Sequence, residues 1–123
     1  MKNPYCISLS FFASLAPLER KVGIAKYPPR YWKGPCATLL APSNPRARDW
    51  RQAYRLDMAS RFADGPQLRD YLMGIAQITP RPIFCCYERQ PEDCHRSVLA
   101  GILREMLGWE VDEWQAPQQG SLL

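Results

Sequence analysis

The sequence predicts an α/β fold: a single small domain with a mostly parallel sheet flanked by helices. Three observations lead to this class. Residues 5–12, 22–25 and 82–87 have the length and composition of strands, and stretches with helical periodicity separate them. The resulting order is strand, strand, helices, strand, helix, strand, which favours a small parallel sheet. The chain of 123 residues is long enough for one core but not for two.

The predicted strands differ in character. Residues 5–12 alternate small polar residues with larger apolar ones, which is the period of a strand. Residues 22–25 form a shorter candidate. Residues 82–87 are a continuous apolar run, so we expect this strand to be buried and central.

Two helices are predicted between the second and third strands. We expect Asn44 to cap the first helix, with Pro45 at its first helical position. Asp64, Gly65 and Pro66 should end this helix and begin the next. Each helix has an apolar stripe that can cover the sheet.

The C-terminal part is predicted to contain one more strand and a tail. Residues 109–114 alternate in polarity, and their acidic residues suit the edge of a sheet. Residues 115–123 are predicted to form a flexible polar tail. The expected organisation is therefore one domain over residues 1–114, followed by this tail.

The loop over residues 26–35 combines aromatic, basic and proline residues. Such a loop can stack on a nucleic-acid base or cover an active site, so Arg30, Tyr31 and Trp32 are candidate ligand-binding residues. The alternative is a proline-stiffened loop whose aromatic side chains seal the edge of the core. The sequence leaves both interpretations open.

The main candidate site is the stretch over residues 83–96, where the third strand leads through a polar loop into a helix. We expect this helix to begin near Glu92 and to end at Gly108. Ligands in open α/β folds bind beyond the carboxyl ends of strands, and a helix start favours anions. The stretch also contains the only histidine, His95. We therefore expect an anionic small molecule or nucleic acid as the partner.

Candidate roles can be given to several residues of this stretch. Cys94 is the candidate nucleophile, because a helix start and cationic neighbours lower the pKa of a thiol. His95 and Glu88 are candidate acid–base groups. Cys86 is either a ligand contact or a small buried residue, whereas Cys85 should face the core on the other side of the strand.

Arg96 has two interpretations. As a ligand-binding residue it can hold a phosphate or carboxylate with two hydrogen bonds. As a structural residue it can pair with Glu88 and so connect the strand end to the helix start. Both roles are compatible with its position in the sequence.

A metal site is considered and not predicted. Cys86, Cys94, His95 and Glu88 carry the donor atoms of zinc sites. However, neighbouring side chains at a helix start diverge, and the chain contains no C-x-x-C pair. It also contains no nucleotide-binding or cofactor-binding motif, so no cofactor is predicted.

Charge and cysteine content suggest a surface and a compartment. Residues 20–61 contain ten basic and two acidic residues, which is typical of a nucleic-acid surface or of a solvated arginine-rich helix face. Five cysteines, two of them adjacent, predict no disulfide framework and favour the cytoplasm. Residues 5–16 faintly resemble a signal peptide, but the interspersed serines and Pro17 favour a core strand. No segment is apolar enough to cross a membrane.

Residues 86–96 contain a C-x-E, a loop with a proline, and C-H-R at the helix start. This arrangement is similar to the signature of DUF488, a family of unknown function. The resemblance also includes residues 9–13, 24–34 and 40–43, and thus extends over nearly the whole chain. It implies a small cytoplasmic α/β domain without implying an activity. Phe11 stands where members of the family often have tyrosine.

Three functional hypotheses follow from the sequence. The favoured one is an anion-binding pocket for a phosphate, a nucleotide or nucleic acid at the C-x-E and C-H-R residues. The first alternative is an enzyme that uses Cys94 as its nucleophile. The second alternative is a purely structural connection between strand and helix.

Overall fold

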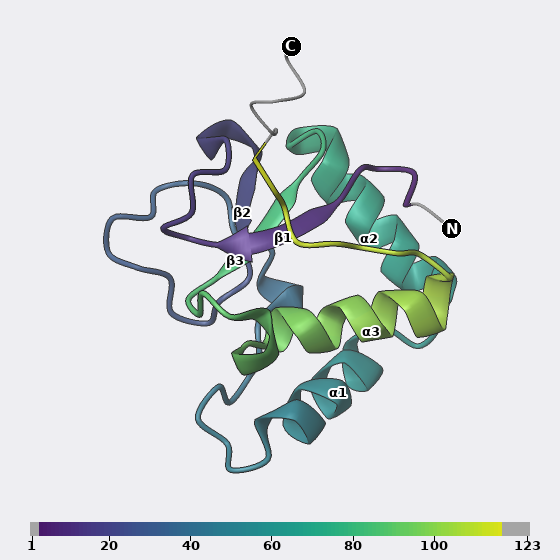
Figure 1. The fold of residues 1–123 in the computed structure, drawn as a ribbon. Helices are drawn as coiled ribbons and strands as arrows, with labels where there is room; N and C mark the ends of the chain where they lie inside the picture. The colour runs from purple at the N-terminus through teal and green to yellow at the C-terminus, as the bar shows by residue number, and fades with distance from the viewer. Residues whose placement is uncertain (1–2, 117–123) are drawn as a thin grey trace.

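The computed structural model describes residues 3–116 and contains a parallel three-stranded sheet (Figure 1). Its strands are β1 (Ser8–Phe11), β2 (Lys21–Gly23) and β3 (Ile83–Cys86), in the order β1-β3-β2. All four residues of β3 are buried, because this strand has a neighbour on each side and side chains pack on both of its faces. The predicted α/β class and the central position of the third strand are confirmed.

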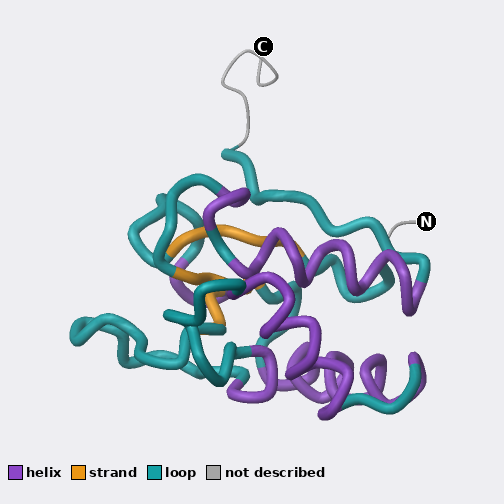
Figure 2. Tube along the Cα trace, turned by 90° about the horizontal axis from the view of Figure 1, so that it is seen from below, coloured by secondary structure: helices purple, strands orange, loops and turns teal. Residues whose placement is uncertain are grey.

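Three helices lie on one side of the sheet: α1 (Trp50–Arg61), α2 (Gly65–Ile78) and α3 (His95–Leu107). Helix α3 packs against β3, and α1 and α2 pack against α3. Their buried side chains share one core with Leu9 of β1 and Phe84 of β3. The opposite face packs against side chains from loops instead, in a smaller cluster. In Figure 2 the helices lie mostly to the right of the strands, and long loops extend to the left.

The two central helices differ in how well their starts were predicted. α2 begins as expected, with Asp64 as the N-cap accepting a 2.9 Å hydrogen bond from the backbone N–H of Gln67. The prediction that Asn44 caps α1 is wrong. Asp49 caps this helix, and Asn44 accepts a turn hydrogen bond from the N–H of Ala47. Both Asn44 and Asp49 have capping side chains, and local sequence did not distinguish them.

The last helix begins later than predicted and ends where expected. Pro91–Asp93 form a separate 3₁₀ turn, and α3 starts at His95 with Cys94 as its N-cap. Gly108 ends the helix with a φ of 69°, a left-handed conformation that glycine adopts without a steric penalty.

Residues 109–114 lie along β1 without forming a regular strand. A parallel bridge joins Leu9 to Glu113, and Leu9 exchanges hydrogen bonds with Asp112 and Trp114 at 3.0 and 2.7 Å. The predicted edge position is confirmed, whereas the predicted strand is reduced to isolated bridges. The tail predicted from residue 115 lies, from residue 117 onward, outside the described residues.

Among residues 3–116, no helix has both the length and the apolar character needed to cross a membrane.

Candidate functional site

A cavity of about 440 Å³ opens beyond the carboxyl end of β3. Its walls come from the end of β3, the start of α3, the loop after β2 and the segment before α1. The lining residues are Ala25, Lys26, Tyr27, Pro42, Pro45, Arg46, Trp50, Cys86, Tyr87, Glu88, Asp93, Cys94 and His95. The predicted strand–loop–helix site therefore lies on a cavity of a size that suits a small molecule.

Two cysteines of the predicted site, Cys86 and Cys94, are joined by a disulfide in this structure. Cys86 is the last residue of β3 and Cys94 is the N-cap of α3, so the bond connects the two elements that form the cavity. The sequence predicted no disulfide framework, and for this pair the prediction is wrong. The two residues lie only eight positions apart, but the intervening loop turns the chain back on itself.

The other cysteines of the described chain are free. Cys6 and Cys36 are exposed, and Cys85 is buried. Cys85 points to the loop-covered face of the sheet, where burial raises the pKa of its thiol to about 12. The expectation that Cys85 is a core residue is confirmed.

His95 is buried, with 8 % of its surface exposed. Its ring lies between the backbone carbonyl of Ile24 and the Sγ atom of Cys94. Its Nε2 atom is 2.6 Å from the carbonyl oxygen of Ile24, so Nε2 carries the proton and donates it. Its Nδ1 atom lies 3.6 Å from the Sγ atom of Cys94. Burial lowers the pKa of His95 to about 4, although the bond to Ile24 partly opposes this shift. The side chain is therefore neutral at pH 7, with Nδ1 unprotonated.

Arg96 is fully buried and uses its whole guanidinium within the protein. Nε and Nη2 donate to the carboxylate of Glu113 at 3.0 to 3.1 Å. Nη1 donates to the Sγ atom of Cys86 at 3.1 Å and to the carbonyl of Glu88, and Nη2 also donates to the carbonyl of Arg89. All five N–H groups are engaged, so no donor remains for an anion.

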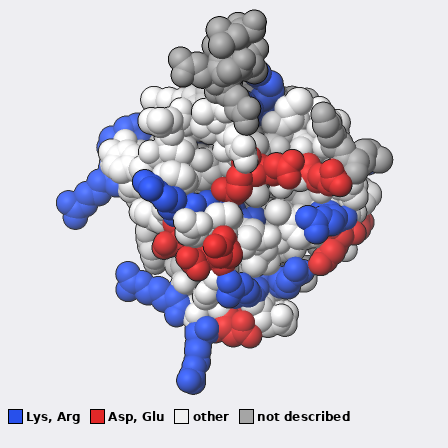
Figure 3. Space-filling model, in the orientation of Figure 1, with Lys and Arg blue, Asp and Glu red and all other residues white. Residues whose placement is uncertain are grey.

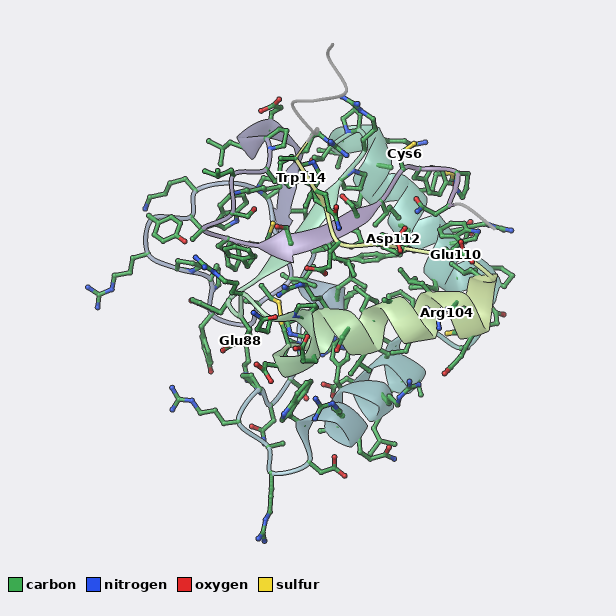
Figure 4. All side chains as sticks on the ribbon, in the orientation of Figure 1. Cys6, Glu88, Arg104, Glu110, Asp112 and Trp114 are labelled. Atoms are coloured by element: carbon green, nitrogen blue, oxygen red, sulfur yellow. A yellow bond between two sulfur atoms is a disulfide. The ribbon has the colours of Figure 1, made fainter. Side chains whose placement is uncertain are left out.

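The predicted ion pair between Arg96 and Glu88 is wrong in its partner. The Glu88 side chain is exposed and lies beside the start of α3, on the lining of the cavity (Figure 4). Only its backbone oxygen contacts Arg96, whose ionic partner is Glu113. Sequence reasoning missed Glu113, although the acidic residues of 109–114 were a signal.

The aromatic loop contributes different residues from those predicted. Arg30, Tyr31 and Trp32 are not among the residues that line the cavity. The Trp32 ring packs 5.4 Å from that of Phe12, and its indole N–H donates to a backbone carbonyl. Trp32 thus seals the edge of the core. Nearer the strand, Lys26 and Tyr27 of the same loop line the cavity.

Several basic side chains of residues 20–61 form hydrogen bonds or ion pairs within the protein. Arg51 donates to the carbonyl of Glu92, Arg61 donates to two backbone carbonyls, and Arg55 pairs with Glu105. On the face shown in Figure 3, acidic and basic side chains are interspersed. Both interpretations of this region, a solvated helix face and a surface for nucleic acid, stay predictions.

Comparison with known protein families, with curated proteins and with solved structures gave no match. The resemblance to DUF488 stays a prediction.

Proposed function

We propose that the chain performs thiol–disulfide exchange, with the Cys86–Cys94 pair reacting with a small thiol or disulfide bound in the cavity. The observation that carries this proposal is the position of the pair. Both cysteines line a cavity of about 440 Å³, and a polar side chain contacts the sulfur of each. A disulfide that only stabilised the fold would need neither the cavity nor these contacts.

Cys94 is the proposed nucleophile, because it is the N-cap of α3 and the helix dipole stabilises a thiolate there. Cys86 is the proposed resolving cysteine. The N–H that Arg96 donates to Cys86 Sγ would bind a thiolate more strongly than a disulfide sulfur. With a pKa of about 4, His95 is too weak a base to keep the Cys94 proton. It orients the sulfur, and the proton passes to solvent.

The proposed exchange takes place in two steps. The Cys94 thiolate attacks one sulfur of a small disulfide, R–S–S–R, and R–S⁻ leaves and takes up a proton. The Cys86 thiolate then attacks Cys94 Sγ and releases the second R–S⁻. Two electrons pass from the cysteine pair to the substrate, which becomes two thiols. A small thiol drives the reverse reaction. We include a cytoplasmic location in the proposal, because that compartment supplies such thiols.

The test is a single-turnover exchange between the reduced chain and an aromatic disulfide, followed by mass spectrometry. The wild-type protein should release two equivalents of aromatic thiol and end with the Cys86–Cys94 bond. Cys86→Ser should stop at a mixed disulfide on Cys94, and Cys94→Ser should react slowly. Cys36→Ser is the matched control, since Cys36 is exposed and unpaired. A mixed disulfide that forms no faster at Cys94 than at Cys36 would refute the proposal.

Anion binding in the same cavity is a second candidate function, because Lys26 and Arg46 line it. Glu88 and Asp93 also line it, so the cavity is of mixed charge and suits a zwitterionic ligand better than a polyphosphate. Under this function, inorganic phosphate should bind, Arg46→Gln should weaken it, and added salt should weaken it further. Phosphate binding that Arg46→Gln leaves unchanged would exclude this function.

A further inference from the structure

We propose that the reduced Cys86–Cys94 pair and His95 form a zinc site whose fourth coordination position faces the cavity. The inference depends on one part of the proposed function, namely that the pair can be reduced. It assigns to the same residues a ligand that thiol exchange does not require.

The first observation is convergence. The ligating atoms of Cys86, Cys94 and His95 all lie within 4.8 Å of one another. A tetrahedral zinc ion with Zn–S of about 2.3 Å and Zn–N of about 2.0–2.1 Å holds two sulfurs and one nitrogen roughly 3.5–3.8 Å apart. Small side-chain movements are enough to bring these three atoms to that spacing.

The sequence argued against a metal because the side chains of the adjacent residues Cys94 and His95 were expected to diverge. In the structure these two side chains lie close together. Cys94 is the N-cap and has an extended backbone, with φ −134° and ψ 149°. Its side chain therefore does not follow the helical rotation that separates neighbours within α3. The result is the 3.6 Å approach of Cys94 Sγ to His95 Nδ1.

The second observation is the orientation of the three groups by their neighbours. Histidines that bind metals almost always donate their other ring N–H to a carbonyl or carboxylate, as Nε2 of His95 does to Ile24. That bond leaves Nδ1 unprotonated, 3.6 Å from the Sγ atom of Cys94. Cys86 Sγ accepts an N–H from Arg96, whose charge Glu113 balances. Two thiolates and Zn²⁺ are together neutral, which suits a buried position.

The third observation is the spacing of the main chain. The Cα atoms of Cys86 and Cys94 are 7.1 Å apart, just beyond the common range for disulfides of about 4.4–6.8 Å. Separating the sulfurs around an ion therefore requires no closer approach of β3 and α3. Two thiolates and one imidazole are a donor set that zinc prefers over magnesium or calcium.

The cavity determines what such a site could do. Three protein ligands with one open position are the arrangement of catalytic zinc, whereas structural sites are closed by a fourth ligand. Here the open position would face the cavity lined by Glu88 and Asp93. Water, a thiolate or a carboxylate would be the exchangeable ligand. A small disulfide would oxidise the two thiolates to the Cys86–Cys94 bond and so release Zn²⁺. The two electrons would pass to the small disulfide, which becomes two thiols.

The test is metal titration of the full chain, reduced by a phosphine under anaerobic conditions. Native mass spectrometry should show one Zn²⁺ per chain. Co²⁺ should give tetrahedral d–d bands and a thiolate-to-cobalt charge-transfer band. Cys94→Ser and His95→Ala should lower the zinc affinity by more than the roughly 10–100-fold typical of changes outside the ligand shell. Cys36→Ser is the control and should bind like the wild type.

Oxidised wild-type protein provides a comparison that needs no substitution, and it should bind no zinc. Equal zinc affinity of the oxidised and reduced chains, or a cobalt complex without the thiolate band, would overturn the inference. Exchange assays run with a chelator keep the two proposals separate. Exchange without zinc binding would overturn the zinc site alone, and zinc binding without exchange would overturn the proposed function alone.

Discussion

Glu113 should contribute far more to stability than Glu88, although the sequence pointed to Glu88 as the partner of Arg96. Removing the Glu113 carboxylate leaves a fully buried guanidinium without its counter-ion. Glu88→Ala keeps the backbone oxygen that accepts from Arg96 and removes only an exposed side chain. The two substitutions therefore test which contact holds Arg96.

The size of the effect follows from the burial of the two partners. Breaking a buried ion pair by removing one partner costs about 3–5 kcal/mol. Here the Glu113 side chain is 32 % exposed, and three other acceptors of Arg96 remain. We therefore expect Glu113→Ala to cost about 2–3 kcal/mol, below or at the lower end of that range. Glu88→Ala should change stability by less than about 0.5 kcal/mol, as is usual for surface substitutions.

The assay is urea denaturation at pH 7 with the cysteine pair oxidised in every variant. With an m-value of about 1–2 kcal/mol/M, the expected loss of about 2–3 kcal/mol should lower the midpoint of Glu113→Ala by on the order of 1–3 M. Glu113→Gln should lie between the wild type and Glu113→Ala, because an amide oxygen still accepts from Arg96. Equal midpoints for the two alanine variants would refute the assignment of Glu113 as the partner.

Two further predictions concern His95 and the glycines. His95 is neutral when folded, with a pKa of about 4 against about 6.5 when unfolded, so the unfolded chain binds more protons between these values. The free energy of unfolding of the oxidised, metal-free protein should be highest above pH 6.5 and fall by roughly 3 kcal/mol towards pH 4. A His95→Gln variant whose free energy of unfolding falls equally steeply between pH 6.5 and 5 would contradict this prediction. Gly108→Ala should cost about 1 kcal/mol because of the positive φ, whereas Gly74→Ala within α2, where a Cβ meets no neighbour, should stabilise by about 0.5–1 kcal/mol. The check is the midpoint of thermal unfolding. If Gly108→Ala and Gly74→Ala shift it in the same direction, backbone conformation does not determine the effect of these substitutions on stability.

Features with a local physical cause could be predicted from the sequence. The apolar run of β3, the Asp64 cap and the glycine at the end of α3 all act within a few residues. The cap of α1 could not be chosen, because Asn44 and Asp49 are chemically similar. Residues 109–114 show the limit of periodicity. Their alternation indicated an extended edge segment, but only pairing with Leu9 determines how much of it joins the sheet.

Several of the candidate site residues lie together on one cavity, but the sequence did not indicate the bonds that they form. Cys86, Glu88, Cys94 and His95 all line the cavity, because a strand end and the following helix start are neighbours in any such fold. The contacts of Arg96 required the course of the chain after α3, which no local pattern encodes. Lys26 enters the cavity for a similar reason, since the turn after β2 decides which part of that loop lies beside β3.

Arg96 also changes the relation between two of the three hypotheses, the structural connection and the thiol enzyme, which the sequence presented as alternatives. Its guanidinium binds the C-terminal segment through Glu113, holds the loop through two carbonyls, and donates to the sulfur of Cys86. The structural connection and the proposed thiol–disulfide site therefore share the same set of hydrogen bonds. Because the donor to sulfur is fixed by Glu113, a loss of that carboxylate should loosen the surroundings of Cys86 as well as the fold. The stability of this chain and its proposed thiol chemistry then depend on the same buried side chain.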